Sequence, residues 1–324
     1  MSADNAWPVL ITRRLAPGVL EHLQPTCRLT VHDHDHPMPR TTLLREAAGQ
    51  AGLLTTLADR VDTELLDAAG QSLRVIANHA VGAHNIDLPA CRARGVVVTT
   101  TPGVLTEATA DQAWALLLSA ARRLGEGERW LRSGRSWHWA PTFLLGLDLS
   151  SATLGILGAG RIGQAIARRA PGFGMRVIYH NRHRLPAAVE QALQASWRPI
   201  DELLESSDAL IVACPLTPET QLLLDAGRLA QLKPTAVLVS ITGGVVDEAA
   251  LAQTLDRQQL FAAALDRYTN EPAVHPALLR HESVTLAPHL GSATIGTRQA
   301  MGALAADNIL AVLTGHPPLT PASP

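Results

Sequence analysis

TLGILGAGRIGQAIARRAPGFGMRVIYHNRHR, residues 153–184, is the stretch that decides the fold. It begins with the apolar run Thr153–Leu157, which has the length of one buried parallel strand. A helical pattern over Arg161–Ala170 follows, and a second apolar run, Met175–Tyr179, comes after it. A strand, a helix and a second strand in this order predict a βαβ unit of a parallel sheet.

Three glycines join the first strand to the helix with the spacing G-x-G-x-x-G. Gly158 permits a tight turn, Gly160 lets the backbone approach a pyrophosphate, and Gly163 lets the helix pack closely on the strand. The free N–H groups at the start of the helix then face the phosphates. A glycine-rich turn without a ligand is the alternative, but the flanking strands and helix favour a dinucleotide site.

The end of the second strand indicates which dinucleotide binds. A site for NAD places Asp or Glu there, roughly 20 residues after the glycine motif, to accept from the ribose 2′-OH. This chain has His180, Asn181, Arg182, His183 and Arg184 instead. No carboxylate in this run repels a 2′-phosphate, and two guanidinium groups are available to pair with one. We therefore predict NADP(H) in preference to NAD(H); solvated charges on a loop are the alternative.

Length and composition set the broad class of protein. A chain of 324 residues with 47% hydrophobic residues is expected to form two buried cores. A net charge of −2 provides no field that favours nucleic acid or an anionic membrane. Three scattered cysteines, with no C-x-x-C pair, suit a reducing cytosol. We find no signal peptide pattern and no run of 18 apolar residues, and we predict a cytoplasmic protein.

Strands and helices alternate along the first hundred residues, which predicts a doubly wound α/β domain ahead of the glycine motif. The expected strands are Trp7–Ile11, Cys27–Val31, Ala51–Thr55, Leu73–Asn78 and Val96–Thr99, and the expected helices are Arg14–Leu23, Thr41–Ala48, Thr63–Ala69 and Leu88–Arg94. Between two of these elements lies His32-Asp33-His34-Asp35-His36-Pro37. Alternating His and Asp can chelate a metal, but a prolyl loop is the plainer alternative, and we predict no metal site.

The alternation continues beyond the glycine motif. The expected strands are Ala209–Ala213, Ala236–Ile241, Phe261–Leu265 and Val284–Leu286, and the expected helices are Leu105–Leu124, Asp201–Glu205, Leu222–Leu224, Ala226–Leu232, Glu248–Arg257 and Ile295–Thr314. Polar or backbone-exposing residues follow four of these strands, at the edge where doubly wound sheets bind ligands: Cys214-Pro215, Thr242-Gly243-Gly244, Asp266 and His289. Ser133–Leu149 is expected to be a loop whose Trp137 and Trp139 mark an interface or a pocket wall, with ordinary packing as the alternative.

With these residues assembled, the chain resembles the D-isomer-specific 2-hydroxyacid dehydrogenases, in particular the glyoxylate/hydroxypyruvate reductases. The resemblance rests on AVGAHNID (80–87), TPGVLTEATAD (101–111), GILGAGRIGQAIARR (155–169), CPLTPET (214–220), GGVVDEAAL (243–251), DRYTNEP (266–272) and APHLGSAT (287–294). It implies two Rossmann-like doubly wound parallel-sheet domains with the active site in the cleft between them. A flavodoxin-like substrate domain would comprise 1–101 plus 294–324, and the NADP domain 102–293. Homodimers are the usual assembly.

The resemblance also implies residue roles. His289 is expected to act as the acid–base group and Glu271 as its partner; a carboxylate beside an imidazole holds the imidazolium form. The backbone amides of Val81 and Gly82 are expected to bind the substrate carboxylate, with Leu54 and Trp139 beside the substrate. The expected cofactor contacts are Thr109, Gly158, Gly160, Arg161, Ile162, Gly163, His180, Asn181, Arg182, Arg184, Cys214, Pro215, Thr220, Ile241, Asp266, His289 and Gly291. For His289 taken alone, a structural histidine is the alternative.

One position departs from the family pattern. An arginine that binds the substrate carboxylate and polarises its carbonyl is expected at Thr242, within SITGGVVD. Three explanations for the missing arginine are open. Arg267 could replace it, the substrate could need less anchoring of its carboxylate, or the protein could be catalytically weak. We predict NADP(H)-dependent reduction of a small 2-oxo acid, glyoxylate or hydroxypyruvate first, to the 2-hydroxy acid. The alternative is a dinucleotide-sensing protein of the same fold with little turnover.

Overall fold

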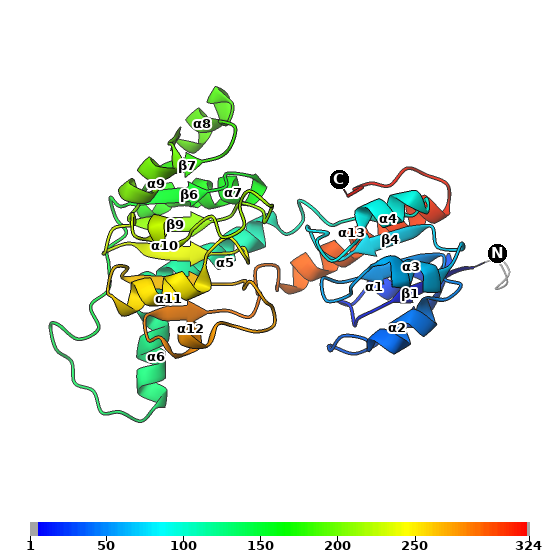
Figure 1. Ribbon diagram of the computed structural model, residues 1–324, viewed down its shortest axis with the longest axis horizontal. Helices are drawn as coiled ribbons and strands as arrows, with labels where there is room; N and C mark the ends of the chain where they lie inside the picture. The colour runs from blue at the N-terminus through cyan, green and yellow to red at the C-terminus, as the bar shows by residue number, and fades with distance from the viewer. Residues whose placement is uncertain (1–5, 323–324) are drawn as a thin grey trace. The chain divides into compact units, whose positions relative to one another are not determined.

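A computed structural model describes residues 6–322 of the chain. It divides into two compact units, Met1–Leu105 with Ala293–Pro324 (the first unit) and Thr106–Ser292 (the second unit). Each unit is built on one parallel sheet flanked by helices (Figure 1). The predicted fold class, two doubly wound parallel-sheet α/β domains, is confirmed.

The first unit contains five parallel strands in the order β2-β1-β3-β4-β5. They are β1 (Trp7–Ile11), β2 (Cys27–Val31), β3 (Gly52–Thr55), β4 (Val75–Asn78) and β5 (Val97–Thr99), and the helices are α1 (Val19–Leu23), α2 (Arg40–Ala47), α3 (Thr63–Ala69), α4 (Leu88–Ala93) and α13 (Ile295–Leu313). Side chains alternate between the two faces, so Leu10 and Val9 belong to different core clusters. Helix α13 returns from the far end of the chain to pack against β3, β4 and α1.

The second unit contains seven parallel strands in the order β12-β11-β10-β9-β6-β7-β8. The strands are β6 (Thr153–Leu157), β7 (Arg176–His180), β8 (Ala195–Trp197), β9 (Ala209–Val212), β10 (Val237–Ser240), β11 (Ala262–Leu265) and β12 (Val284–Leu286). The helices are α5 (Thr106–Ala121), α6 (Leu124–Arg132), α7 (Arg161–Arg169), α8 (Ala187–Leu193), α9 (Ile200–Ser206), α10 (Ala226–Leu229), α11 (Glu248–Asp256) and α12 (Pro276–Arg280), and a 3₁₀ turn spans Ala170–Phe173. The order reverses next to β6, between β9 and β7, which is where ligands bind in such sheets.

Several predicted helices differ from the helices of the structure. The first begins at Val19 rather than Arg14, because Gly18 before it is left-handed (φ 92°). The long helix expected over Leu105–Leu124 ends at Ala121, and α6 starts after Arg123, whose φ of 52° breaks the helical path. The prediction of a helix at Leu222–Leu224 is wrong, because Leu224 instead forms a parallel bridge with Val246.

Residues between α6 and β6 form the predicted loop and carry two exposed tryptophans. Ser133–Leu149 contains neither helix nor strand, and Figure 1 shows this loop extending away from the seven-stranded sheet beside α6. Trp139 is 82% exposed and Trp137 is 54% exposed. Among the described residues, no helix combines the length and apolar character required to cross a bilayer.

Candidate active site

The glycine turn after β6 leaves bare backbone at the start of α7. Gly158 has φ 101°, and a Cβ there would lie 2.3 Å from the Cys214 nitrogen, so only glycine fits. A Cβ on Gly163 would lie 2.2 Å from the Gly158 carbonyl oxygen, so the helix packs directly on the turn. Gly160, the N-cap of α7, has open space where its Cβ would stand, and no side chain caps the helix.

These features fit a dinucleotide pyrophosphate. The N–H groups in the first turn of a helix have no partner within the helix, and the helix dipole favours an anion beside them. The absence of a Cβ over Gly160 lets the phosphate oxygens reach those groups, with Arg161 and Ile162 in the same turn. The uncapped start of α7 is therefore suited to a pyrophosphate held by backbone N–H groups.

Hydrogen bonds join the end of β7 to the glycine turn after β6. His180 O accepts from Gly158 N (3.0 Å), and Asn181 Oδ1 accepts from Ala159 N (2.7 Å). The indole of Trp197 on β8 donates to Asn181 O (3.2 Å), and the imidazole Nδ1 of His180 contacts Arg198 O (2.9 Å). The side chains of His180 and Asn181 are thus engaged in shaping the turn.

The two predicted phosphate-binding arginines differ in their surroundings. Arg184 forms a two-point contact with Glu190, Nε to Oε1 at 2.8 Å and Nη2 to Oε2 at 2.7 Å, and Tyr179 Oη donates to Oε1 (2.6 Å). The hydrogen bonds from Arg184 and then Tyr179 lower the pKa of Glu190 to about 2. Arg182 is exposed and forms no side-chain hydrogen bond within residues 6–322, but its charge, after a hydrogen bond from Thr217, helps to lower the pKa of Glu219. Arg182 is therefore the freer of the two guanidinium groups.

The other predicted cofactor residues lie along the same carboxyl edge of the sheet. Cys214 is buried after β9, and burial raises the pKa of its thiol to about 11. Thr220 Oγ1 donates to Pro215 O (2.6 Å) and closes that loop. Ile241 is buried after β10. Thr109 of α5 lies against Gly291, where a Cβ would stand 3.2 Å from Thr109 Cγ2.

Asp266 fixes the loop that carries His289. Its carboxylate is buried and accepts from Leu290 N (2.7 Å) and Gly291 N (2.9 Å), with Gln112 Nε2 at 3.4 Å. The Asp266 carbonyl also accepts from His289 N (2.9 Å). These bonds hold His289 in a left-handed conformation, with φ 56°. Asp266 and Gln112 therefore position the histidine backbone, and the role of Gln112 was not predicted from the sequence.

His289 and Glu271 form the predicted pair. His289 Nδ1 lies 3.1 Å from Glu271 Oε2, and the two side chains are 35% and 28% exposed. Burial alone would raise the pKa of Glu271, but the hydrogen bond and charge of His289, the charge of Arg267 and the Tyr268 N–H together lower it to about 2. An ionised Glu271 accepts at Nδ1–H of the imidazole. Nε2, which makes no hydrogen bond within residues 6–322, can then exchange a proton with a ligand.

Thr242 stands at the end of β10, where the resemblance implies an arginine. Its hydroxyl Oγ1 is buried and has no hydrogen-bond partner among the described residues. Arg267, in the loop after β11, places Nε 3.4 Å from Glu271 Oε1. Besides the Asp266 carboxylate, this edge of the second unit therefore holds His289, Glu271, Arg267 and a Thr242 hydroxyl that is unpaired among the described residues.

The turn after β4 in the first unit is a candidate anion-binding site. No backbone carbonyl within residues 6–322 accepts from the N–H groups of Val81 and Gly82, and Val81 is 44% exposed. Asn78 Nδ2 donates to Gly82 O (2.9 Å) and so holds the turn. Successive free N–H groups in such a turn form a concave site for an anion. The Leu54 side chain, in contrast, is fully buried in the core and has no surface to offer a substrate.

The histidine-rich segment after β2 is held by ion pairs. Arg14 pairs with Asp33 (2.8 Å) and Asp35 (3.3 Å), and the rings of His32, His34 and His36 lie with centroids 4.9 to 5.2 Å apart. Within the described part of the chain, no group of three or more His, Cys, Asp or Glu side chains could hold a metal ion.

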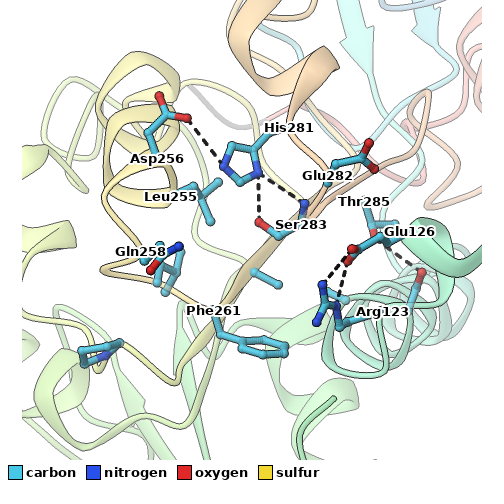
Figure 2. Close-up of a pocket in the computed structure, with 15 residues that line it drawn as sticks. Arg123, Glu126, Leu255, Asp256, Gln258, Phe261, His281, Glu282, Ser283 and Thr285 are labelled. Atoms are coloured by element: carbon cyan, nitrogen blue, oxygen red, sulfur yellow. Dashed lines mark hydrogen bonds and ion pairs between the residues drawn. The ribbon is translucent and has the colours of Figure 1, made fainter. Parts of the chain in front are cut away.

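A cavity of about 460 Å³ lies at the opposite, amino-terminal edge of the seven-stranded sheet (Figure 2). It contains none of the predicted site residues. In it, His281 Nδ1 contacts Ser283 Oγ (2.9 Å) and the Ser283 N–H (3.3 Å), so this imidazole caps the turn before β12. Asp256 lies 3.7 Å from His281 Nε2. The cavity is on the wrong edge of the sheet to belong to the dinucleotide site.

Comparison with known proteins identifies the family. The family described as D-isomer specific 2-hydroxyacid dehydrogenase, NAD binding domain, matches residues 114–291, more than half of the chain. The chain belongs to the D-isomer-specific 2-hydroxyacid dehydrogenases. The second unit of this dehydrogenase is accordingly a domain for a nicotinamide dinucleotide, in agreement with the glycine turn.

Relatives of this dehydrogenase match along nearly the whole chain. The glyoxylate reductases of Thermococcus onnurineus and Thermococcus kodakarensis are each 45% identical over 317 residues, 96% of this chain and 94% and 95% of theirs. Among solved structures, an NADPH-dependent glyoxylate/hydroxypyruvate reductase from Sinorhizobium meliloti, in complex with NADP and malonate, has a TM-score of 0.82 and 35% identity, covering 98% of this chain and 97% of its own. A glyoxylate reductase from Paecilomyes thermophila has a TM-score of 0.85 and 31% identity, covering 98% of each chain.

Proposed function

We propose that this dehydrogenase reduces a small 2-oxo acid, glyoxylate or hydroxypyruvate first, to the corresponding 2-hydroxy acid. The observation that carries the proposal is the His289–Glu271 pair, which shares one sheet edge with the glycine turn of the dinucleotide site. The names of the relatives support the substrate class.

The proposed chemistry assigns a task to each residue. A reduced nicotinamide dinucleotide, when bound, supplies a hydride to the ketone or aldehyde carbon. His289, protonated on both nitrogens, gives the Nε2 proton to the carbonyl oxygen as negative charge develops there. Glu271 accepts from Nδ1–H throughout and so orients the ring for this transfer. The N–H groups of Val81 and Gly82 bind the substrate carboxylate.

We further propose that NADP(H) is preferred over NAD(H). The run His180–Arg184 contains no carboxylate to accept from a ribose 2′-OH. Glu190 lies nearby but is neutralised by Arg184, so it does not offer a free charge to repel a phosphate. Arg182 remains exposed for a charge-assisted contact with a 2′-phosphate.

The assembly and compartment are also proposals. A homodimer is supported by the exposed Trp137 and Trp139, because aromatic residues are enriched in interfaces. A cytoplasmic location is supported by the three free cysteines, Cys27, Cys91 and Cys214, which suit a reducing compartment.

A dinucleotide-sensing protein with little turnover is the second candidate, and the neutral residue Thr242 is the observation in its favour. Oxidation of NADPH and NADH in the presence of glyoxylate, hydroxypyruvate and larger 2-oxo acids separates the two. Turnover with a small 2-oxo acid supports the reductase. Tight cofactor binding with no oxidation in any of these mixtures favours the sensor.

A further inference from the structure

A 2-oxo acid brings a carboxylate and a polarisable carbonyl oxygen to the site, and both are recognised best by positively charged hydrogen-bond donors. This inference rests on the proposed function, which supplies the substrate class. At the end of β10 the side chain is Thr242, which carries no charge. Its buried hydroxyl is unpaired among the described residues, so one donor at this edge has no partner within the protein.

The turn that carries Thr242 touches the loop that carries Arg267. A Cβ on Gly243 would lie 2.3 Å from Tyr268 O and 3.4 Å from Tyr268 N. The backbones of the two loops are therefore in direct contact at these positions. Arg267 directly precedes Tyr268, and Thr242 directly precedes Gly243. The backbone of Arg267 is therefore close to the backbone of the uncharged residue Thr242.

Only one of the nitrogens of the Arg267 guanidinium contacts Glu271. Its Nε lies 3.4 Å from Glu271 Oε1, at the long limit for a hydrogen bond, and neither Nη group forms a hydrogen bond within residues 6–322. Arg184 and Glu190, by comparison, form a closed two-point contact at 2.8 and 2.7 Å. A guanidinium has five N–H donors, so Arg267 retains the pair of Nη groups that binds carboxylates in a fork geometry.

We propose that Arg267 is the guanidinium that binds the substrate in this chain, with Nε on Glu271 and its Nη groups on the substrate carboxylate. Glu271 then contacts both the substrate-binding guanidinium and the acid–base imidazole, because its Oε1 faces Arg267 and its Oε2 faces His289.

The test compares Arg267→Leu with Arg94→Leu. Arg94 is the matched control, since its side chain is similarly exposed (35% against 27%) and pairs with one carboxylate, Asp67, in the first unit. We expect kcat/KM for glyoxylate to fall about 10²- to 10³-fold in Arg267→Leu, the loss typical of removing one preorganised donor, and to stay within twofold in Arg94→Leu. Arg267→Lys, which retains the charge, should give an intermediate value.

Binding of oxamate, a substrate-like carboxylate, to the NADPH complex is the second measurement, and a merely structural role would leave it unchanged. We expect its Kd to rise about 10-fold or more in Arg267→Leu, with unchanged NADPH affinity. If Arg267→Leu does not fold, Arg267→Lys decides: a kcat/KM and an oxamate Kd equal to those of the wild type overturn the inference.

The two proposals fail in different ways. If the wild type reduces glyoxylate and the folded Arg267→Leu variant does so within threefold, Arg267 is not the substrate-binding cation although the proposed function stands. If the wild type reduces no 2-oxo acid, the proposed function fails, and oxamate binding alone decides whether Arg267 holds a carboxylate.

Discussion

Gly160→Ala tests the dinucleotide site in isolation from the fold. A Cβ at Gly160 meets nothing within 4 Å, and the residue's φ of −75° suits an alanine. The methyl group would instead occupy the space through which a pyrophosphate reaches the first turn of α7. An extra methyl in a closely packed contact typically costs about 1 to 3 kcal/mol, which corresponds to a rise in Kd for NADPH of about 5- to 150-fold.

The fold should survive this change. Gly160 is an N-cap, and alanine is a poorer N-cap, so we expect a loss of stability of about 0.5 to 1 kcal/mol and a drop in Tm of a few degrees. Gly172→Ala is the control, because a Cβ there also meets nothing within 4 Å but lies in the 3₁₀ turn after α7. Gly163→Ala should behave differently and destabilise the second unit, since its Cβ would stand 2.2 Å from the Gly158 carbonyl oxygen.

Two measurements check this: NADPH affinity from the quenching of protein fluorescence, and Tm from circular dichroism. A folded Gly160→Ala variant that binds NADPH within twofold of the wild type would refute the backbone pyrophosphate site. A Gly163→Ala variant as stable as the wild type would contradict the packing argument for the turn.

Three further predictions concern the cofactor, the catalytic carboxylate and the assembly. Arg182→Ala should lower kcat/KM for NADPH about 10-fold or more and leave that for NADH nearly unchanged, whereas equal losses with both would show that Arg182 does not contact a 2′-phosphate. The pKa of Glu271 is about 2 in the folded chain against 4.5 for a free group, so its contribution to stability is present above pH 4.5 and is lost as the pH falls toward about 2. Urea unfolding across this range should show the wild type losing more stability than Glu271→Gln, and parallel curves would contradict the assignment. Light scattering should give about twice the chain mass of 34.5 kDa, with Trp139→Ala weakening the dimer, and a monomeric wild type would refute the assembly.

The parallel sheets could be predicted because their signals are local. Apolar runs such as Thr153–Leu157, separated by helical patterns and glycine turns, specify strands and their carboxyl ends without tertiary information. The break at Arg123 could not be predicted, because nothing in an apolar helical pattern marks a residue that adopts φ 52°. The three-residue strand β8 is likewise too short to show a period.

The sequence indicates which residues belong to the site, but not which hydrogen bonds and ion pairs those residues form with one another. The sequence shows that His289, Glu271 and Asp266 follow strands, yet only the structure shows that Asp266 is occupied by the Leu290 and Gly291 N–H groups. The same holds for Arg184, whose charge is taken up by Glu190 six residues later. Which charges remain free for a ligand depends on tertiary contacts, and composition does not reveal it.

The most direct test of the proposed reaction compares the wild type with His289→Asn in an assay that follows NADPH oxidation by glyoxylate. Asparagine tolerates the left-handed φ of 56° at this position and removes the proton donor. The wild type should oxidise NADPH and form glycolate in equal amounts, and kcat should fall about 10²- to 10⁴-fold in His289→Asn with NADPH affinity retained. Glyoxylate reduction by a folded His289→Asn variant at the wild-type rate would contradict the account.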